Sequence, residues 1–247
     1  MPAYDYIIFD ADHTVIDFDA DERRAFRAAF RAAGIEPTAD MVEACWRFSA
    51  ENWAHHGLYN VHLPEIQARY HELYHIHVRD IMDFADGMYG LGEKKPVAAC
   101  TFEEELSREA HPVENAPEVL AALAERYKLC IATNGLVFMQ VGRLAALRPL
   151  ICRTFISEEM GAIKPAPAFF RAMTDALGAP PSRCLMVGDS LGSDVAGANA
   201  AGMDCIWFDR RGEALPQGYR VKAVIAHLNE LCLLYTSDAA DDLIGVD

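Results

Sequence analysis

Residues 6–14 read YIIFDADHT, in which four apolar or aromatic residues run into two aspartates separated by one alanine. A continuous apolar run of this length, rather than an alternating one, is typical of a strand covered on both faces in a parallel sheet. Asp10 and Asp12 follow the carboxyl end of this strand, where open α/β sheets bind their ligands. The segment therefore predicts an architecture and the edge of the sheet that carries the chemistry.

Further short apolar runs repeat this pattern, and loop or helix signals follow each of them. They lie at 129–132, 154–156, 184–187, 205–208 and 223–225. Strands that alternate with helices in this way predict a doubly wound, Rossmann-like α/β fold with a parallel sheet.

The long stretch between the first two predicted strands has helical patterning instead. Phe26 and Phe30 are spaced i, i+4 before Gly34, and further helical runs cover 39–54 and 64–84. We therefore expect an inserted helical cap domain. The predicted boundaries are 18–111 for the cap, with a flexible connection near 87–96, and 1–17 with 112–231 for the catalytic core.

The composition changes sharply at Cys232, where the chain reads CLLYTSDAADDLIGVD to its last residue. Back-translation of residues 232–242 resembles the reverse complement of a transposon-type sequencing adapter. We therefore interpret residues 232–247 as a non-native tail, exclude them from the fold, and expect the natural protein to continue differently beyond Leu231.

The overall charge argues against a nucleic-acid partner, because 37 acidic residues outnumber 22 basic ones and give a net charge of −15. The seven cysteines are scattered without metal-ligand spacing, which favours reduced thiols. No apolar run approaches the length of a membrane span. We expect a cytoplasmic monomer or homodimer that acts on a small molecule.

The paired aspartates suit a covalent mechanism. Asp10 can attack as a nucleophile, while Asp12 protonates the leaving group and later activates water. Paired aspartates alone are a weak signal, since they also occur in calcium loops and on solvated turns.

Three later motifs supply groups that two carboxylates cannot provide: phosphate-binding groups, a cation and further metal ligands. IATNG places a hydroxyl at Thr133 and backbone N–H groups at Asn134 and Gly135 after the next strand, as a phosphate cradle or an ordinary turn. Lys164, before a proline-initiated helix, offers a cation. MVGDSLGSD offers Asp189 and Asp194 as oxygen ligands for Mg²⁺. The four motifs together, in one order along the chain, favour a single site.

These motifs resemble those of the haloacid dehalogenase-like hydrolase superfamily, and the resemblance extends to Leu231. More narrowly, FDADHTVIDFD, ATNG, ISEEMGAIKP and MVGDSLGSD are similar to the motifs of bacterial pyrimidine 5′-nucleotidases. The resemblance implies a Mg²⁺-dependent phosphomonoesterase that forms an aspartyl-phosphate. It implies the following roles: catalysis by Asp10 and Asp12; phosphate binding by Thr133, Asn134 and Lys164; metal binding by Asp10, Asp12 and Asp189; support of the metal site by Asp194.

His13 departs from the family pattern, which has Gly or Glu there, but it lies outside these roles. In the cap, Trp46, Trp53, His56 and Tyr59, with Phe48 and His55 beside them, are candidates for stacking on a nucleobase, or equally for core packing. Four alternatives remain open: a phosphatase of phosphoglycolate or a sugar phosphate, a haloacid dehalogenase, a phosphomutase, and a noncatalytic protein of the same fold.

Overall fold

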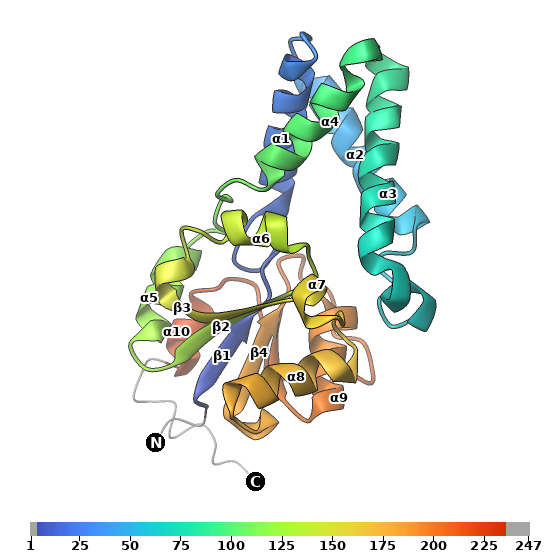
Figure 1. Ribbon diagram of the computed structural model, residues 1–247. Helices are drawn as coiled ribbons and strands as arrows, with labels where there is room; N and C mark the ends of the chain where they lie inside the picture. The colour runs from blue at the N-terminus through green and yellow to red at the C-terminus, as the bar shows by residue number, and fades with distance from the viewer. Residues whose placement is uncertain (1–3, 236–247) are drawn as a thin grey trace. The chain divides into compact units, whose positions relative to one another are not determined.

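The computed structural model describes residues 4–235 and contains one sheet of parallel strands in the order β3-β2-β1-β4-β5-β6 (Figure 1). The strands are β1 (Tyr6–Phe9), β2 (Lys128–Thr133), β3 (Ile151–Ile156), β4 (Cys184–Gly188), β5 (Asp204–Phe208) and β6 (Ala223–Ile225). Each predicted run became a strand, with ends shifted by a few residues at most. The predicted fold class is therefore confirmed.

The central strand β1 lies between β2 and β4, and its register brings three carboxyl ends together. Phe9 is opposite Ile131 of β2 on one side and Val187 of β4 on the other. The residues that follow these positions, Asp10 above all, therefore share one edge of the sheet. This edge is where the sequence predicts the site.

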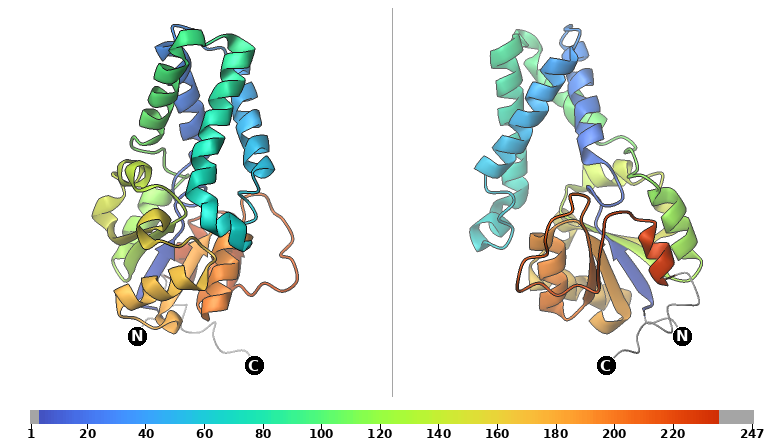
Figure 2. Two further views of the ribbon diagram at one scale, coloured as in Figure 1. Left: turned by 45° about the vertical axis from the view of Figure 1, so that its right-hand side comes forward. Right: turned by 180° about the vertical axis from the view of Figure 1, so that it is seen from behind.

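Helices cover both faces of the sheet, which explains its continuous apolar strands. On one face lie α8 (Pro167–Leu177) and α9 (Ala196–Ala201), and on the other lie α5 (Ala116–Ala124) and α10 (Glu230–Tyr235) (Figures 1 and 2). Phe169 of α8 packs in a buried cluster with residues of the sheet. Shorter elements are α7 (Ser157–Met160) and the turns η2 (Arg148–Leu150), η3 (Pro181–Arg183) and η4 (Leu191–Val195).

A second compact unit contains residues 17–111 and 135–146. Its helices are α1 (Phe18–Ala32), α2 (Ala39–His55), α3 (Pro64–Tyr89), α4 (Lys95–Leu106) and α6 (Val137–Arg143), with the turn η1 (Gly92–Lys94) before α4. Residues 135–146, which the sequence analysis assigned to the core, thus cluster with the helical unit. The connection expected near 87–96 consists of the end of α3, η1 and the start of α4.

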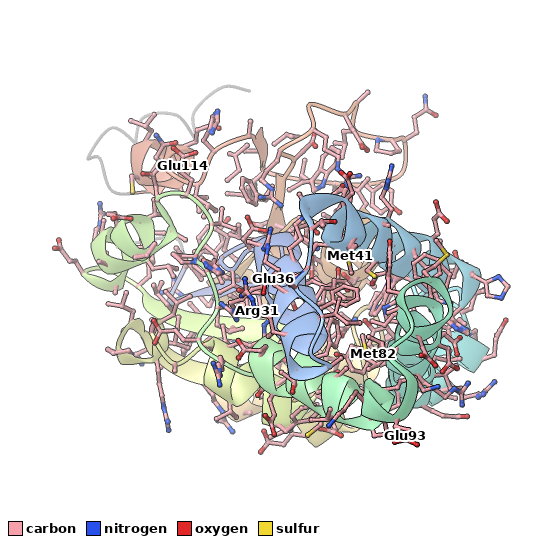
Figure 3. The ribbon with its side chains drawn as sticks, turned by 90° about the horizontal axis from the view of Figure 1, so that it is seen from above. Arg31, Glu36, Met41, Met82, Glu93 and Glu114 are labelled. Atoms are coloured by element: carbon pink, nitrogen blue, oxygen red, sulfur yellow. The ribbon has the colours of Figure 1, made fainter. Side chains whose placement is uncertain are left out.

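The helical unit has its own hydrophobic core, built from the apolar faces of α1 to α4 together with Met139 of α6; Figure 2 shows the course of these helices. Phe26 of α1 contacts Phe102 of α4 with ring centroids 4.8 Å apart. Met82 of α3 is buried in the same core, whereas Arg31 lies in the last turn of α1 and Glu36 in the segment that follows it (Figure 3). Within the described residues this unit therefore holds its helices together without the sheet.

No helix within residues 4–235 is long and apolar enough to cross a membrane. The tail predicted at 232–247 begins inside α10, which extends to Tyr235. Residues 236–247, the rest of that prediction, lie outside the described part of the chain.

Candidate active site

Asp10 and Lys164 meet in the interior at the carboxyl end of the sheet. Asp10 directly follows β1, and its backbone N–H donates to the carbonyl oxygen of Val187, 2.9 Å away. Lys164 Nζ donates to Asp10 Oδ1, Asp194 Oδ1 and the carbonyl oxygen of Ala132, each at 2.6 Å. An ammonium group has three hydrogens, so these contacts use all of them and fix its position.

Each charged group in this cluster favours the ionised form of its oppositely charged partner. Burial lowers the pKa of Lys164, but the nearby charges of Asp10 and Asp194 outweigh it and raise the pKa above its ordinary value. Burial raises the pKa of Asp10 well above its ordinary value, and the charge of Lys164 opposes this shift. Lys164 therefore stays protonated and is the charge that favours the ionised form of Asp10.

Asn134 fixes the loop that carries Lys164. Its Nδ2 donates to the carbonyl oxygen of Lys164 at 2.9 Å, and its Oδ1 accepts from the backbone N–H of Lys164 at 2.7 Å. The side chain of Asn134 thus positions the lysine, which leaves its backbone as the group for the predicted phosphate contact. Thr133, one residue earlier, is buried at the end of β2.

After Asp10 the chain makes a tight turn around the carbonyl oxygen of Ala11, which accepts from the backbone N–H groups of Thr14, Val15 and Ile16. His13 has φ +62° in this turn. Such left-handed backbone favours glycine, which explains why glycine is common here in the family pattern. The turn places Asp12 two residues beyond Asp10, half-buried at the same edge.

Asp189 and Asp194 follow β4 and complete an acidic group. Asp10, Asp189 and Asp194 each offer a carboxylate oxygen, and these oxygens lie within 4.8 Å of one another. Burial, with the charge of Asp194 second, raises the pKa of Asp189 to about 6. Thr14 Oγ1 contacts Asp189 Oδ1 at 3.4 Å. The chain thus gathers more carboxylates than Lys164 alone can neutralise.

This donor set fits Mg²⁺, a hard cation that prefers carboxylate and carbonyl oxygens. Asp194 already accepts from Lys164 through Oδ1 and from the backbone N–H of Ser190 through Oδ2, 3.1 Å away. Its oxygens are therefore engaged in positioning neighbouring groups, which suits the supporting role predicted for it. Asp10 and Asp189 are better placed to offer an oxygen to a cation.

The sequence analysis missed two residues that shape this group. A Cβ at Gly188 would lie 2.3 Å from Asp194 Oδ2, so only glycine fits there. Trp207 of β5 donates from Nε1 to the carbonyl oxygen of Asp189 at 2.9 Å. Gly188 could have been found from its place before Asp189, but Trp207 acts through the strand register, opposite Gly188, and leaves no local signal.

The aromatic residues predicted for specificity lie in the helical unit. Trp46 has its ring 3.8 Å below the Arg23 guanidinium. Trp53 makes edge contacts with Tyr59, Tyr70, Tyr74 and His77. Trp46, Phe48 and Trp53 are all partly buried against the helical core. Packing therefore accounts for much of these three side chains, and stacking on a base stays a prediction.

The three remaining candidates, His55, His56 and Tyr59, are polar or exposed. His56 Nε2 lies 2.8 Å from Asp80 Oδ2, and His55 is exposed. Tyr59 is 65% exposed, which makes it the most accessible of the four aromatic candidates for contact with a ligand.

The helical unit also buries a series of hydrogen-bonded polar side chains that the sequence analysis did not identify. Ser49 Oγ is 2.5 Å from Glu22 Oε1 and 3.2 Å from His77 Nε2, and His77 Nδ1 is 2.7 Å from Asn52 Oδ1. Burial raises the pKa of Glu22 to about 7 and lowers the pKa of His77 to about 4. Glu22 therefore keeps its proton to a higher pH than an ordinary glutamate does.

Comparisons with known proteins show the family of the chain. A family model described as haloacid dehalogenase-like hydrolase matches residues 4–202. Pyrimidine 5′-nucleotidase PynA of Streptococcus pneumoniae is 29% identical over 211 residues, which are 83% of this chain and 84% of that protein. Pyrimidine 5′-nucleotidase YjjG of Escherichia coli is 34% identical over 123 residues, 49% of this chain and 55% of that protein.

Solved structures share the fold. A magnesium-bound structure of the putative HAD-hydrolase YfnB from Bacillus subtilis has a TM-score of 0.77 at 24% identity, covering 94% of this chain and 98% of that one. The L-2-haloacid dehalogenase RSc1362 has a TM-score of 0.72 at 18% identity, covering 95% and 100%. At these identities the likeness concerns the fold alone.

Proposed function

This chain belongs to the haloacid dehalogenase-like hydrolase family, and on that premise we propose that it hydrolyses phosphoric monoesters through an aspartyl-phosphate on Asp10. The observation that carries the proposal is the buried contact of Lys164 Nζ with both Asp10 and Asp194 at 2.6 Å. A fixed cation beside the attacking carboxylate favours its ionised form and offsets the charge of an incoming phosphate.

The reaction divides into two displacements at phosphorus. A carboxylate oxygen of Asp10 forms a bond to phosphorus as the ester P–O bond breaks, and Asp12 gives its proton to the departing alkoxide. Asp12, now a carboxylate, takes a proton from a water molecule whose oxygen attacks the same phosphorus. The Asp10–phosphate bond breaks, which restores the carboxylate and releases inorganic phosphate.

The second carboxylate also distinguishes the proposed chemistry from halide displacement. Asp12 has no task in a dehalogenase, which needs no acid for a halide leaving group. Asp10 and Asp189, with the backbone carbonyl of Asp12, would hold Mg²⁺. When bound, the ion supplies positive charge to the phosphate oxygens.

For the substrate we propose a pyrimidine nucleoside 5′-monophosphate. Support comes from the similarity to PynA, which extends over most of both chains, and to YjjG over about half of each. A phosphatase of another small metabolite is the second candidate. It is favoured by the phosphoserine phosphatase of Thermus thermophilus, 36% identical over 121 residues, 47% of this chain and 49% of that protein.

A panel of phosphate monoesters with Mg²⁺ tests both levels of the proposal. We expect dUMP, dTMP or UMP to be hydrolysed faster than phosphoglycolate, sugar phosphates or phosphoserine, and EDTA to abolish the release of phosphate. Asp10→Asn should lower turnover by at least about 10⁴-fold, because the nucleophile is lost. Asp175→Asn, at an exposed position of α8, is the matched control and should keep full activity.

The outcomes separate the two claims. Faster turnover of the other esters would overturn the nucleotide assignment and leave the phosphatase assignment standing. Phosphate release that persists in Asp10→Asn would overturn the aspartyl-phosphate mechanism. Chloride release from 2-chloropropionate that is insensitive to EDTA would instead identify a dehalogenase.

A further inference from the structure

We propose that Cys130 and Cys152 form a reversible oxidation site, in which hydrogen peroxide converts the two thiols to a disulfide between β2 and β3. The two Sγ atoms are 3.3 Å apart. Both cysteines are free thiols, Cys130 buried and Cys152 exposed. The Cys152 sulfur is therefore accessible to an oxidant in solution, and the buried Cys130 sulfur is in contact with it.

The backbone accounts for this approach. In the parallel pairing of β2 with β3, Leu129 is opposite Ile151 and Cys130 is opposite Arg153. Cys152 is thus the extra residue of a bulge, and a bulge redirects the side chain that it carries. A disulfide requires a Cα separation of about 4.4–6.8 Å, and a spacing of about 4.8 Å between neighbouring strands allows such a separation across the bulge.

The position of β3 makes the exposed thiol accessible. β3 is one of the two edge strands of the sheet (Figure 1), and Cys152 is exposed on it. Cys130, by contrast, lies in the buried cluster with Ile8, Phe155 and Met173. This asymmetry determines the order of events, because peroxide reaches only Cys152.

The proposed reaction has two steps. The Cys152 thiolate attacks one oxygen of hydrogen peroxide, the O–O bond breaks, and Cys152 becomes a sulfenic acid as hydroxide leaves. The Cys130 sulfur then attacks the Cys152 sulfur, the S–O bond breaks, and the departing hydroxide takes the Cys130 proton as water. The thiols lose two electrons and the peroxide gains them.

The surroundings of Cys130 both hinder and assist the second step. Burial raises the pKa of its thiol, and the charge of Arg153 opposes this shift. Because the thiolate is the nucleophile, a thiol whose pKa is raised reacts slowly with a partner that it must meet by diffusion. Contact with the sulfenic acid compensates, because a reaction between fixed neighbours needs no encounter.

The site would connect the edge of the sheet with the strand that positions the catalytic lysine. Cys130 lies two residues before Ala132, whose carbonyl oxygen accepts a hydrogen bond from Lys164 Nζ. The inference is independent of the substrate, because it depends only on the two thiols and their separation.

Peroxide treatment of the full chain tests the proposal, with Cys100→Ser as background because Cys100 is exposed and can link two molecules. Non-reducing tryptic mapping should reveal peptide 129–143 joined to peptide 144–153, with the loss of two hydrogen atoms and of two titratable thiols. Dithiothreitol should restore both thiols.

Cys152→Ser is the decisive variant, because its position is exposed and the fold tolerates a hydroxyl there. It should abolish the linked peptide and leave Cys130 reduced at the same peroxide concentration. In the otherwise unchanged chain, oxidation of exposed Cys100 to sulfenic acid reports that enough peroxide is present. The proposal is overturned if Cys100 is fully oxidised and no linked peptide has formed. It is equally overturned if Cys130 links to another cysteine instead.

Discussion

The two units each bury a polar cluster, but the clusters handle charge in opposite ways. In the unit that contains the sheet, Lys164 lies between Asp10 and Asp194 at 2.6 Å from each, so opposite charges face one another. In the helical unit, Glu22 and His77 are joined only through a serine hydroxyl. Burial there raises the pKa of the acid and lowers that of the base, so both groups favour their neutral forms.

Hydrogen-bond accounting explains the neutral cluster. Asn52 donates to Asp80, which turns its Oδ1 toward His77, so that His77 Nδ1 must carry a hydrogen. His77 Nε2 and Glu22 then both face Ser49, whose hydroxyl has one hydrogen. Because its lowered pKa keeps His77 neutral, its Nε2 accepts the serine hydrogen, and the contact of Glu22 with Ser49 is then satisfied when Glu22 carries a proton. Burial without a directly bonded cation shifts Glu22 toward its neutral form, whereas contact with Lys164 favours the charged form of Asp10.

Other charges surround the neutral cluster at greater distance. Asp19 and Arg23 of α1 and Arg143 of α6 act on Glu22 with opposing signs. His56 and Asp80 act in the same opposing way on His77. Burial raises the pKa of Cys45 of α2, and the charge of ionised Glu22 raises it further. The contrast between the clusters therefore depends on direct contact with a cation. It can be tested by substitutions in either cluster.

The largest effect is expected when the charged cluster loses its cation. Lys164→Met leaves Asp10 and Asp194 buried without their partner, which should lower the free energy of unfolding by about 3–5 kcal/mol. Phosphate release should fall by about 10²–10³-fold as well. Urea unfolding and the phosphatase assay measure the two effects.

Lys222→Met is the control, because Lys222 pairs with Asp204 at 3.4 Å and is 54% exposed. It should change stability by less than about 1 kcal/mol. A loss for Lys164→Met no larger than that of the control would show that the buried charges are not mutually dependent.

The next effect concerns the proton on Glu22. Its pKa is raised from 4.5 to about 7, so its contribution to stability is complete below pH 4.5 and is lost as pH rises through about 7. Glu22→Gln keeps a donor toward Ser49 that cannot ionise. The variant should therefore gain about 2–3 kcal/mol relative to wild type between about pH 5 and about pH 7.

His77 makes this comparison sharper. Its pKa is lowered from 6.5 to about 4, so its contribution is present above 6.5 and lost as pH falls toward 4. In wild type the two groups oppose each other in the shared range, and in Glu22→Gln only the histidine slope remains. Urea titrations at several pH values measure this, with Glu51→Gln, exposed on α2, as control. Parallel pH profiles for Glu22→Gln and wild type would mean that Glu22 is ionised in the folded protein.

A smaller effect is expected from the hydroxyl that joins the acid to the base. Ser49→Ala leaves Glu22 and His77 without their shared partner, which should cost about 1–2 kcal/mol at neutral pH. Ser107→Ala removes a hydroxyl that bonds the carbonyl oxygen of Glu104 in an exposed position, and should cost less than about 0.5 kcal/mol. Equal costs for the two variants would contradict the buried series of hydrogen bonds.

The sequence predicted the charged cluster but not the neutral one, for a physical reason. Asp10, Lys164 and Asp189 follow strands or precede a helix, and parallel strands bring such positions to one edge. The family and the fold class followed from these motifs and are confirmed. Their roles in catalysis remain predictions.

The neutral cluster depends on helix packing, which no single segment reveals. Glu22 is four residues before Phe26, so it lies on the apolar face of α1, and His77 lies between buried Tyr74 and Val78 on α3. A polar residue on such a face was the available signal. The assignment of 135–146 to the helical unit had no comparable signal, because it follows from contacts with residues far away in the sequence.

The smallest effect is expected where the same kinds of groups meet outside the interior. Arg31 and Glu36 form an ion pair at 3.3 Å at the end of α1 (Figure 3), with side chains 60% and 80% exposed. Water already solvates both charges, so Arg31→Gln should change the free energy of unfolding by less than about 0.5 kcal/mol. A loss approaching that of Lys164→Met would mean that contact between charges, rather than burial, sets the energetics of both clusters.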